Sequence, residues 1–141
     1  MGRKPKTDPN AAIILSQHAE DVGDFAIYPN ANTRNAAEVA YCGLELAGEV
    51  GEIANALKKA IRDDRFGKEG RALTPSRRLQ LVDEAGDSLW AWCRLVYSIA
   101  ATPDEVARHN IAKLEARFCD PESPTYSETI AHRRSIRRKR R

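Results

Sequence analysis

The sequence has little that would support disulfides, structural zinc or membrane insertion. Its three cysteines, Cys42, Cys93 and Cys119, are odd in number and widely spaced. No C-x-x-C pair is present, so neither a zinc site nor a redox dithiol is expected. The N-terminus lacks an apolar signal core, and the most apolar stretch, residues 88–101, is interrupted by Arg94 and too short to span a bilayer. These absences favour a soluble, cytoplasmic protein.

Signals for β-strands are also almost absent, whereas helix starts are well marked. Asn35 followed by Glu38 is typical of an N-cap with its reciprocal partner, and Thr74 and Thr102 each precede a proline suited to the first helical position. We therefore expect helices over about residues 10–22, 35–61, 74–100 and 102–118. The sequence predicts an all-α fold of the four-helix-bundle type, with an irregular segment at residues 23–34 that is a candidate lid or substrate loop.

The formal net charge of +3 hides an uneven distribution. Residues 132–141 contribute seven Lys or Arg, and residues 11–132 hold 13 basic and 19 acidic side chains, a balance of −6. After residue 118 the composition turns to Pro, Ser and Thr and then to Arg, which bury too little apolar area to offset the entropy of ordering. We expect an all-α domain over residues 10–118 and a mobile basic tail over residues 119–141.

The basic tail raises a second class of function, that of a nucleic-acid-binding or interaction protein. Seven cations in ten residues would contact phosphates in a way that weakens steeply with salt. No aromatic residues interleave with these arginines, and no recognition motif is present. A solubilising tail is the simpler interpretation, and nucleic acid is not expected as the main partner.

Four glutamates form an acidic stripe along the helix predicted at residues 35–61. At about 100° per residue, Glu38, Glu45, Glu49 and Glu52 fall within about 60° of one another, beside an apolar sector. Like charges at this spacing repel by about 0.2–0.5 kcal/mol per pair. The stripe is therefore either a solvated face or a site for a compensating cation.

The helix predicted at residues 74–100 supplies a second acidic pair, Glu84 and Asp87. Glu84 shares its sector with Leu81 and Ser88, which predicts that it points toward the bundle interior. A carboxylate there must be paired, protonated or metal-bound, and helix bundles build metal sites from acidic side chains on facing helices. Oxygen ligands without His or Cys favour Mg²⁺, with Mn²⁺ as the alternative.

These motifs resemble a known family. Gly48-Glu49-Val50-Gly51-Glu52, followed by Glu84-Ala85-Gly86-Asp87, resembles the paired E-x-x-E and E-x-x-D signature of the MazG-like all-α nucleotide pyrophosphohydrolases. Residues 110–118 resemble that family's last helix, so the resemblance covers roughly residues 36–118. Gly48 stands where the fuller pattern has an acidic residue, a variant similar to the dCTP pyrophosphatase and phage-type branch.

The resemblance implies a set of metal ligands and a reaction. Glu49, Glu52, Glu84 and Asp87 are expected to hold Mg²⁺. The resemblance leaves three roles open for Glu45. It could contact the metal ligands without binding the metal, form part of a second metal site, or be an ordinary surface residue. The implied reaction converts a (deoxy)nucleoside triphosphate to the monophosphate and pyrophosphate by attack of water at the α-phosphorus, in nucleotide-pool control or house-cleaning. Glu49 is then the residue expected to orient or deprotonate the water.

Candidate substrate contacts are fewer and less specific. Lys59 lies seven residues beyond Glu52, on the acidic stripe, while Asn110, Lys113 and Arg117 share one stripe of the last predicted helix. Each is also explained as a solvated helix residue. The resemblance implies a homodimer or homotetramer, and it leaves open whether dGTP, dCTP, dUTP, a modified nucleotide or an alarmone is preferred.

Overall fold

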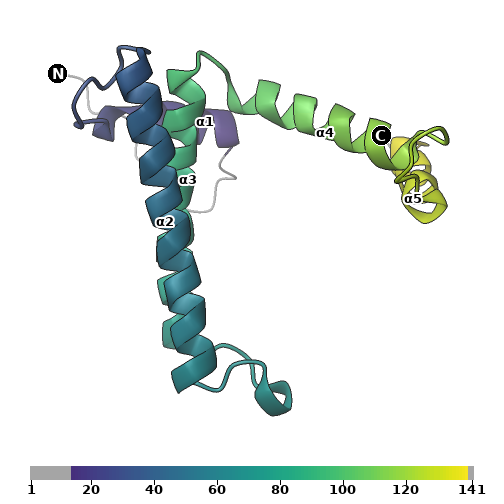
Figure 1. Cartoon of the computed structure of the whole chain (residues 1–141), viewed down its shortest axis with the longest axis horizontal. Helices are drawn as coiled ribbons and strands as arrows, with labels where there is room; N and C mark the ends of the chain where they lie inside the picture. Colours follow the sequence, from purple (N-terminus) through teal and green to yellow (C-terminus); the bar gives the residue numbers. More distant parts are fainter. Residues whose placement is uncertain (1–13, 140–141) are drawn as a thin grey trace. The chain divides into compact units, whose positions relative to one another are not determined.

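The computed structural model describes residues 14–139, and within that range it contains helices and connecting segments but no strand. Figure 1 shows the course of the chain. The predicted all-α class is confirmed. The part of the first predicted helix that precedes residue 14 lies outside the described residues. The elements in order are α1 (Leu15–Asp21), the 3-10 turn η1 (Val22–Phe25), α2 (Ala36–Asp63), the 3-10 turn η2 (Lys68–Gly70), α3 (Pro75–Ser98), α4 (Pro103–Cys119) and α5 (Glu128–Lys139).

The three longest helices begin where the sequence predicts. The side chains of Asn35, Thr74 and Thr102 each accept a hydrogen bond from the backbone N–H three residues later, at 2.9, 3.3 and 3.2 Å respectively. Pro75 and Pro103 occupy the first turn of α3 and α4, where a missing N–H costs nothing. Local cap chemistry therefore sets these helix starts.

The chain divides into two compact units, the first ending at Ala101 and the second beginning at Thr102. The domain boundary expected from composition, after residue 118, stays a prediction. Within the second unit, α4 contacts α5. The four-helix bundle predicted for residues 10–118 is not formed within the first unit and stays a prediction.

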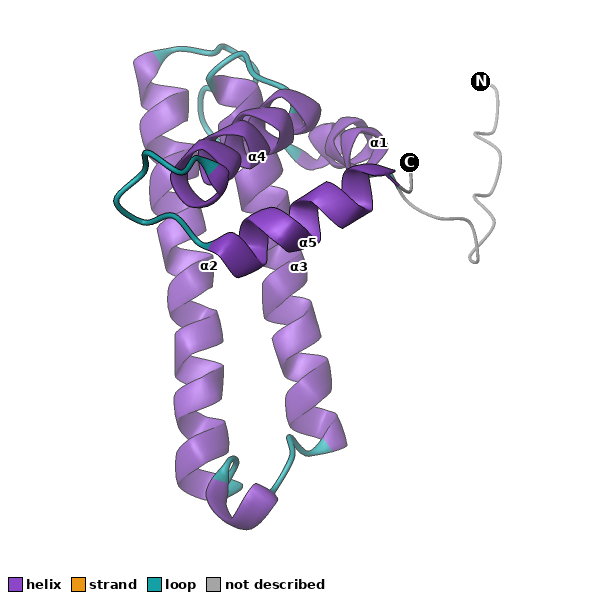
Figure 2. Cartoon of the chain, turned by 90° about the vertical axis from the view of Figure 1, so that its right-hand side faces the viewer, coloured by secondary structure: helices purple, strands orange, loops and turns teal. Residues whose placement is uncertain are grey.

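The first unit is built on a helical hairpin in which α2 and α3 lie side by side and run in opposite directions (Figures 1 and 2). α1 and η1 contact α3, and the indole Nε1–H of Trp90 donates a hydrogen bond of 3.3 Å to the backbone oxygen of Val22. The buried apolar residues described in the structure are mostly small, which lets the helix backbones approach closely. They are Cys42, Ala56, Ala60, Ala91, Cys93 and Val96.

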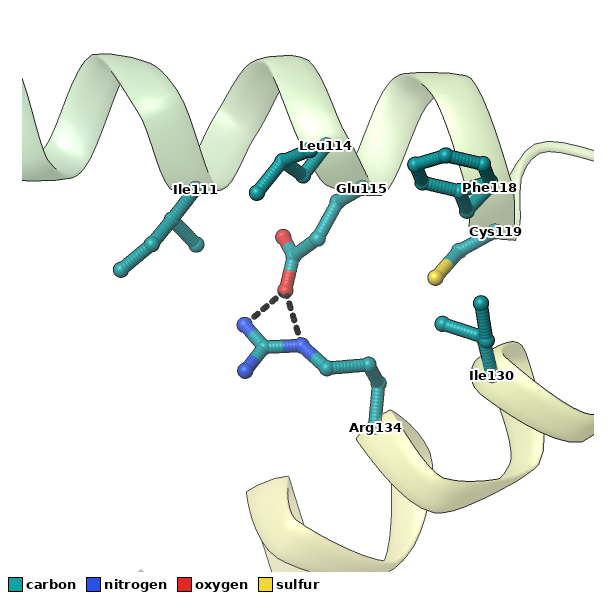
Figure 3. Close-up of a pocket in the computed structure, with 7 residues that line it drawn as sticks. All are labelled: Ile111, Leu114, Glu115, Phe118, Cys119, Ile130 and Arg134. Atoms are coloured by element: carbon teal, nitrogen blue, oxygen red, sulfur yellow. Dashed lines mark hydrogen bonds and ion pairs between the residues drawn. The ribbon is translucent and has the colours of Figure 1, made fainter. Parts of the chain in front are cut away.

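The second unit consists of α4 and α5, joined through one acidic side chain. Figure 3 shows Arg134 reaching from α5 to Glu115 on α4, beside a mainly apolar hollow between the helices. Arg138 also binds Glu115, at 2.5 Å. Residues 128–139 therefore form a helix in the segment for which composition predicts a mobile tail. Paired arginines, which an apolar-area argument ignores, account for the difference.

None of the helices described between residues 14 and 139 is both long enough and apolar enough to cross a membrane.

Candidate metal centre

Three carboxylates meet on the α2–α3 hairpin. Glu49 of α2 and Glu84 and Asp87 of α3 each offer an oxygen, and these oxygens all lie within 4.8 Å of one another. Glu49 and Glu84 are half-buried, while Asp87 is exposed. The antiparallel pairing of α2 with α3 brings together residues about 35 positions apart in the chain. We call these three residues the acidic cluster.

The electrostatics of the acidic cluster are unfavourable for a lone set of carboxylates. Burial raises the pKa of Glu49, and the nearby charges of Asp87, Glu52, Glu45 and Glu84 raise it further. No Lys or Arg among residues 14–139 forms an ion pair with any member of the cluster. A bound cation would relieve this repulsion.

The donor set fits a hard divalent cation. All three donors are carboxylate oxygens, and the cluster contains no histidine or cysteine, which suits Mg²⁺ or Mn²⁺. Two oxygens bound to one Mg²⁺ at its usual distance lie at most about 4.2 Å apart. The oxygens of the cluster lie within 4.8 Å of one another, so small rotations of the carboxylate side chains would bring them to this distance. Waters would complete the coordination.

The other two predicted acidic residues lie at the margin of this site. Glu52 is exposed and does not join the group of oxygens within 4.8 Å, although its charge acts on Glu49. Glu45 is half-buried and likewise raises the pKa of Glu49. Three of the four predicted ligands are thus brought together, and the roles of Glu52 and Glu45 stay predictions.

A residue that sequence reasoning did not select lies one turn beyond Glu84. The Oγ of Ser88 is buried and has no hydrogen-bond partner among residues 14–139. Buried hydroxyls are normally paired, so this one is available to a water or a ligand. A lone serine carries no sequence signal for such a role.

Lys59 is half-buried near the end of α2. The pKa of Asp63 is lowered chiefly by its hydrogen bond from Arg62, with a smaller electrostatic contribution from Lys59. Lys59 forms no ion pair with a described residue. Its ammonium group is therefore free to meet an anion.

The three predicted contacts on α4 are all exposed. Asn110, Lys113 and Arg117 belong to the second unit, whereas the acidic cluster belongs to the first. The guanidinium of Arg117 lies 5.5 Å from the ring centroid of Phe118. Their participation in a substrate site stays a prediction.

A buried polar cluster fixes residues 28–34 to the hairpin. The carboxylate of Glu38, 0% exposed, accepts hydrogen bonds from the Tyr28 hydroxyl at 3.0 Å and from the backbone N–H groups of Asn32 and Arg34 at 2.8 and 2.6 Å. Arg94 of α3 donates to the Tyr28 hydroxyl at 3.0 Å and to Asn32 at 2.7 Å. The segment predicted as a lid or substrate loop is therefore tied to both α2 and α3.

The charges of this buried cluster are compensated, in contrast to those of the acidic cluster. Burial alone would raise the pKa of Glu38, but the backbone hydrogen bonds from Arg34 and Asn32, with Tyr28 and Arg94, outweigh it and lower the pKa. Glu38 was expected on an acidic stripe with Glu45 and Glu49. Its structural role is instead to hold the preceding segment, a role that the sequence signals only through its cap position after Asn35.

The helices and the acidic cluster define the protein as all-helical over the described residues, with a candidate metal centre on a hairpin. Over 95 residues the chain is 37% identical to the Gene 37 protein of Mycobacterium phage L5, a match that covers 67% of this chain and 79% of the phage protein. The chain therefore belongs to the family of that phage protein. No protein-family model and no solved structure matches the sequence.

Proposed function

We propose that this protein is a magnesium-dependent nucleoside triphosphate pyrophosphohydrolase of the MazG-like type. The observation that carries the proposal is the acidic cluster, in which Glu49, Glu84 and Asp87 present oxygens within 4.8 Å of one another from two helices. The motifs that resemble the MazG-like signature supply these residues. Uncompensated carboxylates at a partly open site are suited to binding a cation together with a phosphate-bearing substrate.

The reaction is hydrolysis of the bond between the α- and β-phosphates. The oxygen of a water attacks the α-phosphorus. The bond from the α-phosphorus to the oxygen that bridges it to the β-phosphate breaks, and pyrophosphate leaves. Bound Mg²⁺ supplies neutralisation of the phosphate oxygens and of the leaving pyrophosphate. Glu49 would accept the proton of the attacking water as a general base.

Further residues complete the proposed site. Glu52 would help to hold the cation, and the ammonium group of Lys59 would bind the outer phosphates. The family resemblance also predicts Asn110, Lys113 and Arg117 as nucleotide contacts, and this stays a prediction. We propose that the protein acts in the cytoplasm, where nucleoside triphosphates occur.

A screen of nucleoside triphosphates with Mg²⁺ tests the proposal. The substrates are dGTP, dCTP, dUTP, modified nucleotides and alarmones, and the products are assayed separately as pyrophosphate and orthophosphate. We expect pyrophosphate with the nucleoside monophosphate, and loss of turnover in Glu52→Gln and Asp87→Asn. Asp83→Asn is the matched control, because Asp83 is an exposed carboxylate on α3 outside the acidic cluster.

Two results would overturn the proposal. Release of single orthophosphates would contradict the choice of bond. Equal turnover in Asp87→Asn and Asp83→Asn, with both variants folded by circular dichroism, would remove the acidic cluster from the reaction.

We further propose that the chain acts as a homodimer or homotetramer. The hairpin exposes large apolar side chains, among them Leu44 of α2, which is 75% exposed, and Leu79 and Val82 of α3, which are 59% and 51% exposed. In the proposed assembly, these side chains would be buried between subunits. We expect light scattering to give a multiple of the chain mass and Leu44→Glu to lower it, whereas a monomeric wild-type protein would refute this assembly.

A further inference from the structure

Helix α5 gathers cations that no part of the proposed hydrolase uses. Over twelve residues it carries Arg133, Arg134, Arg137, Arg138 and Lys139 against a single acidic residue, Glu128. This is a regular helix, so the cations project at fixed helical spacings. The question is which of them are already neutralised within the protein.

Glu115 neutralises only part of this charge. Its carboxylate binds both Arg134 and Arg138 (Figure 3 shows Arg134), and these contacts, led by the hydrogen bond from Arg134, lower the pKa of Glu115. One carboxylate against two guanidinium groups leaves a net positive charge. Arg133, Arg137 and Lys139 form no ion pair with any residue from 14 to 139.

The unpaired arginines are grouped on one flank of α5. Arg133 and Arg137 are i,i+4 neighbours, about 6 Å apart along the helix axis, and they line a shallow hollow together with Arg134, Ile130 and Ile136. Both are exposed. The contacts with Glu115 anchor the helix to α4 and so hold this row of cations in place.

We infer that α5 is a second interaction surface that binds the phosphate backbone of nucleic acid. Each strand of a duplex presents one negative charge per about 3.4 Å, so two cations one helical turn apart can both meet phosphates of the same strand. Guanidinium groups suit phosphate oxygens because they offer paired donors. This surface lies outside the acidic cluster, and the inference does not rest on the proposed hydrolase activity.

The side chains of α5 favour backbone contacts over base readout and over lipid. The helix contains no Asn, Gln, Phe, Tyr or Trp, and its exposed arginines are spaced to meet phosphates, so we expect binding to depend little on base sequence. Its two isoleucines are too few for the broad apolar face with which an amphipathic helix enters a bilayer. One of them, Ile130, also lines the hollow that faces α4 (Figure 3).

The test uses the full chain and three labelled probes. These are a mixed-sequence DNA duplex of about 20 base pairs, a single-stranded RNA of similar length, and vesicles containing phosphatidylserine, each titrated between about 50 and 200 mM salt. We expect binding to at least one nucleic acid, weakening with salt with a log–log slope of roughly −3. The duplex and RNA arms distinguish which nucleic acid supplies the phosphates.

Arg133→Ala/Arg137→Ala is the decisive variant. Alanine favours helix, so α5 should remain folded, and we expect at least tenfold weaker binding with a salt slope smaller by about two. Arg71→Ala/Arg78→Ala removes two exposed cations from the first unit and should bind like the wild type. Arg133→Lys/Arg137→Lys keeps both charges and should retain most of the affinity.

Several results would overturn the inference. They are an absence of binding to both nucleic acids at low salt, equal weakening in the two double-alanine variants, or binding to the vesicles alone. Pyrophosphate release is measured separately, and its absence would leave this result unaffected.

Discussion

Arg94 and Glu38 lie 56 residues apart in the sequence and meet inside the α2–α3 hairpin, with 3.4 Å between the Nη2 of Arg94 and the Oε1 of Glu38. Their side chains are 3% and 0% exposed. The same two residues share the Tyr28 hydroxyl and the Asn32 residue as partners. The pair therefore joins α2, α3 and the segment that precedes α2.

Removing Arg94 should be strongly destabilising. Arg94→Met leaves the Glu38 carboxylate buried without its cation, and breaking a buried pair in this way costs about 3–5 kcal/mol. Arg94→Lys keeps the charge but not the forked geometry, and should lose less. Urea unfolding measures the free energies. The control is Arg62→Met, whose pair with Asp63 is exposed to solvent and should contribute far less to stability. Equal losses in Arg94→Met and Arg62→Met would contradict this account of the hairpin.

Glu49 should make stability fall as pH rises in the absence of divalent cations. Its folded-state pKa lies above the ordinary value of 4.5, so between the two values the folded protein holds a proton that the unfolded chain has released. The associated stability is present below the ordinary pKa and is lost as pH rises through the raised one. We expect Glu49→Gln to be more stable than wild type at neutral pH, with the difference shrinking on acidification to about pH 4.

Thermal unfolding of wild type and Glu49→Gln across this pH range, in a chelating buffer, measures the difference. Glu122→Gln, which alters an exposed carboxylate in the second unit, is the control. A wild-type curve parallel to that of Glu49→Gln at every pH would show that the Glu49 proton is not linked to folding.

How much of this arrangement the sequence predicts depends on the range of the interaction. The caps at Asn35, Thr74 and Thr102 act within one helical turn, and the starts of α2, α3 and α4 follow from them. Helical periodicity likewise places Glu84 and Asp87 on one helix and Glu49 on another. Only the register of the antiparallel hairpin decides that Glu49, and not Glu52, comes within 4.8 Å of both.

The contacts that sequence reasoning missed are pairs formed across the fold. From its sequence neighbours alone, Arg94 is only an interruption of an apolar stretch. Its partner Glu38 is likewise only one more glutamate on an acidic stripe. The helix α5 was missed for a related reason, because composition counts apolar area and takes no account of Arg134 and Arg138 converging on Glu115. Neither pairing has a short-range motif.

Glu115 should hold α5 against α4. Glu115→Gln removes the negative charge that binds Arg134 and Arg138, so we expect the backbone amides of residues 128–139 to exchange faster with solvent, while those of α2 and α3 are unchanged. Hydrogen exchange followed by mass spectrometry gives this measurement. Asp104→Asn, which breaks the exposed pair with Arg108 at 3.6 Å, should leave α5 protected. Unchanged protection of α5 in Glu115→Gln would show that the apolar contacts alone hold it.

Direct cation binding tests the acidic cluster, on which the proposed function depends. Mn²⁺ binding followed by electron paramagnetic resonance, with Mg²⁺ as competitor, can be measured on wild type, Glu84→Gln, Asp87→Asn and the control Asp83→Asn. We predict that wild type and Asp83→Asn bind Mn²⁺ alike and release it to Mg²⁺, whereas Glu84→Gln and Asp87→Asn lose tenfold or more in affinity. Equal binding by all four proteins, or none by the wild type, would contradict a metal centre at Glu49, Glu84 and Asp87.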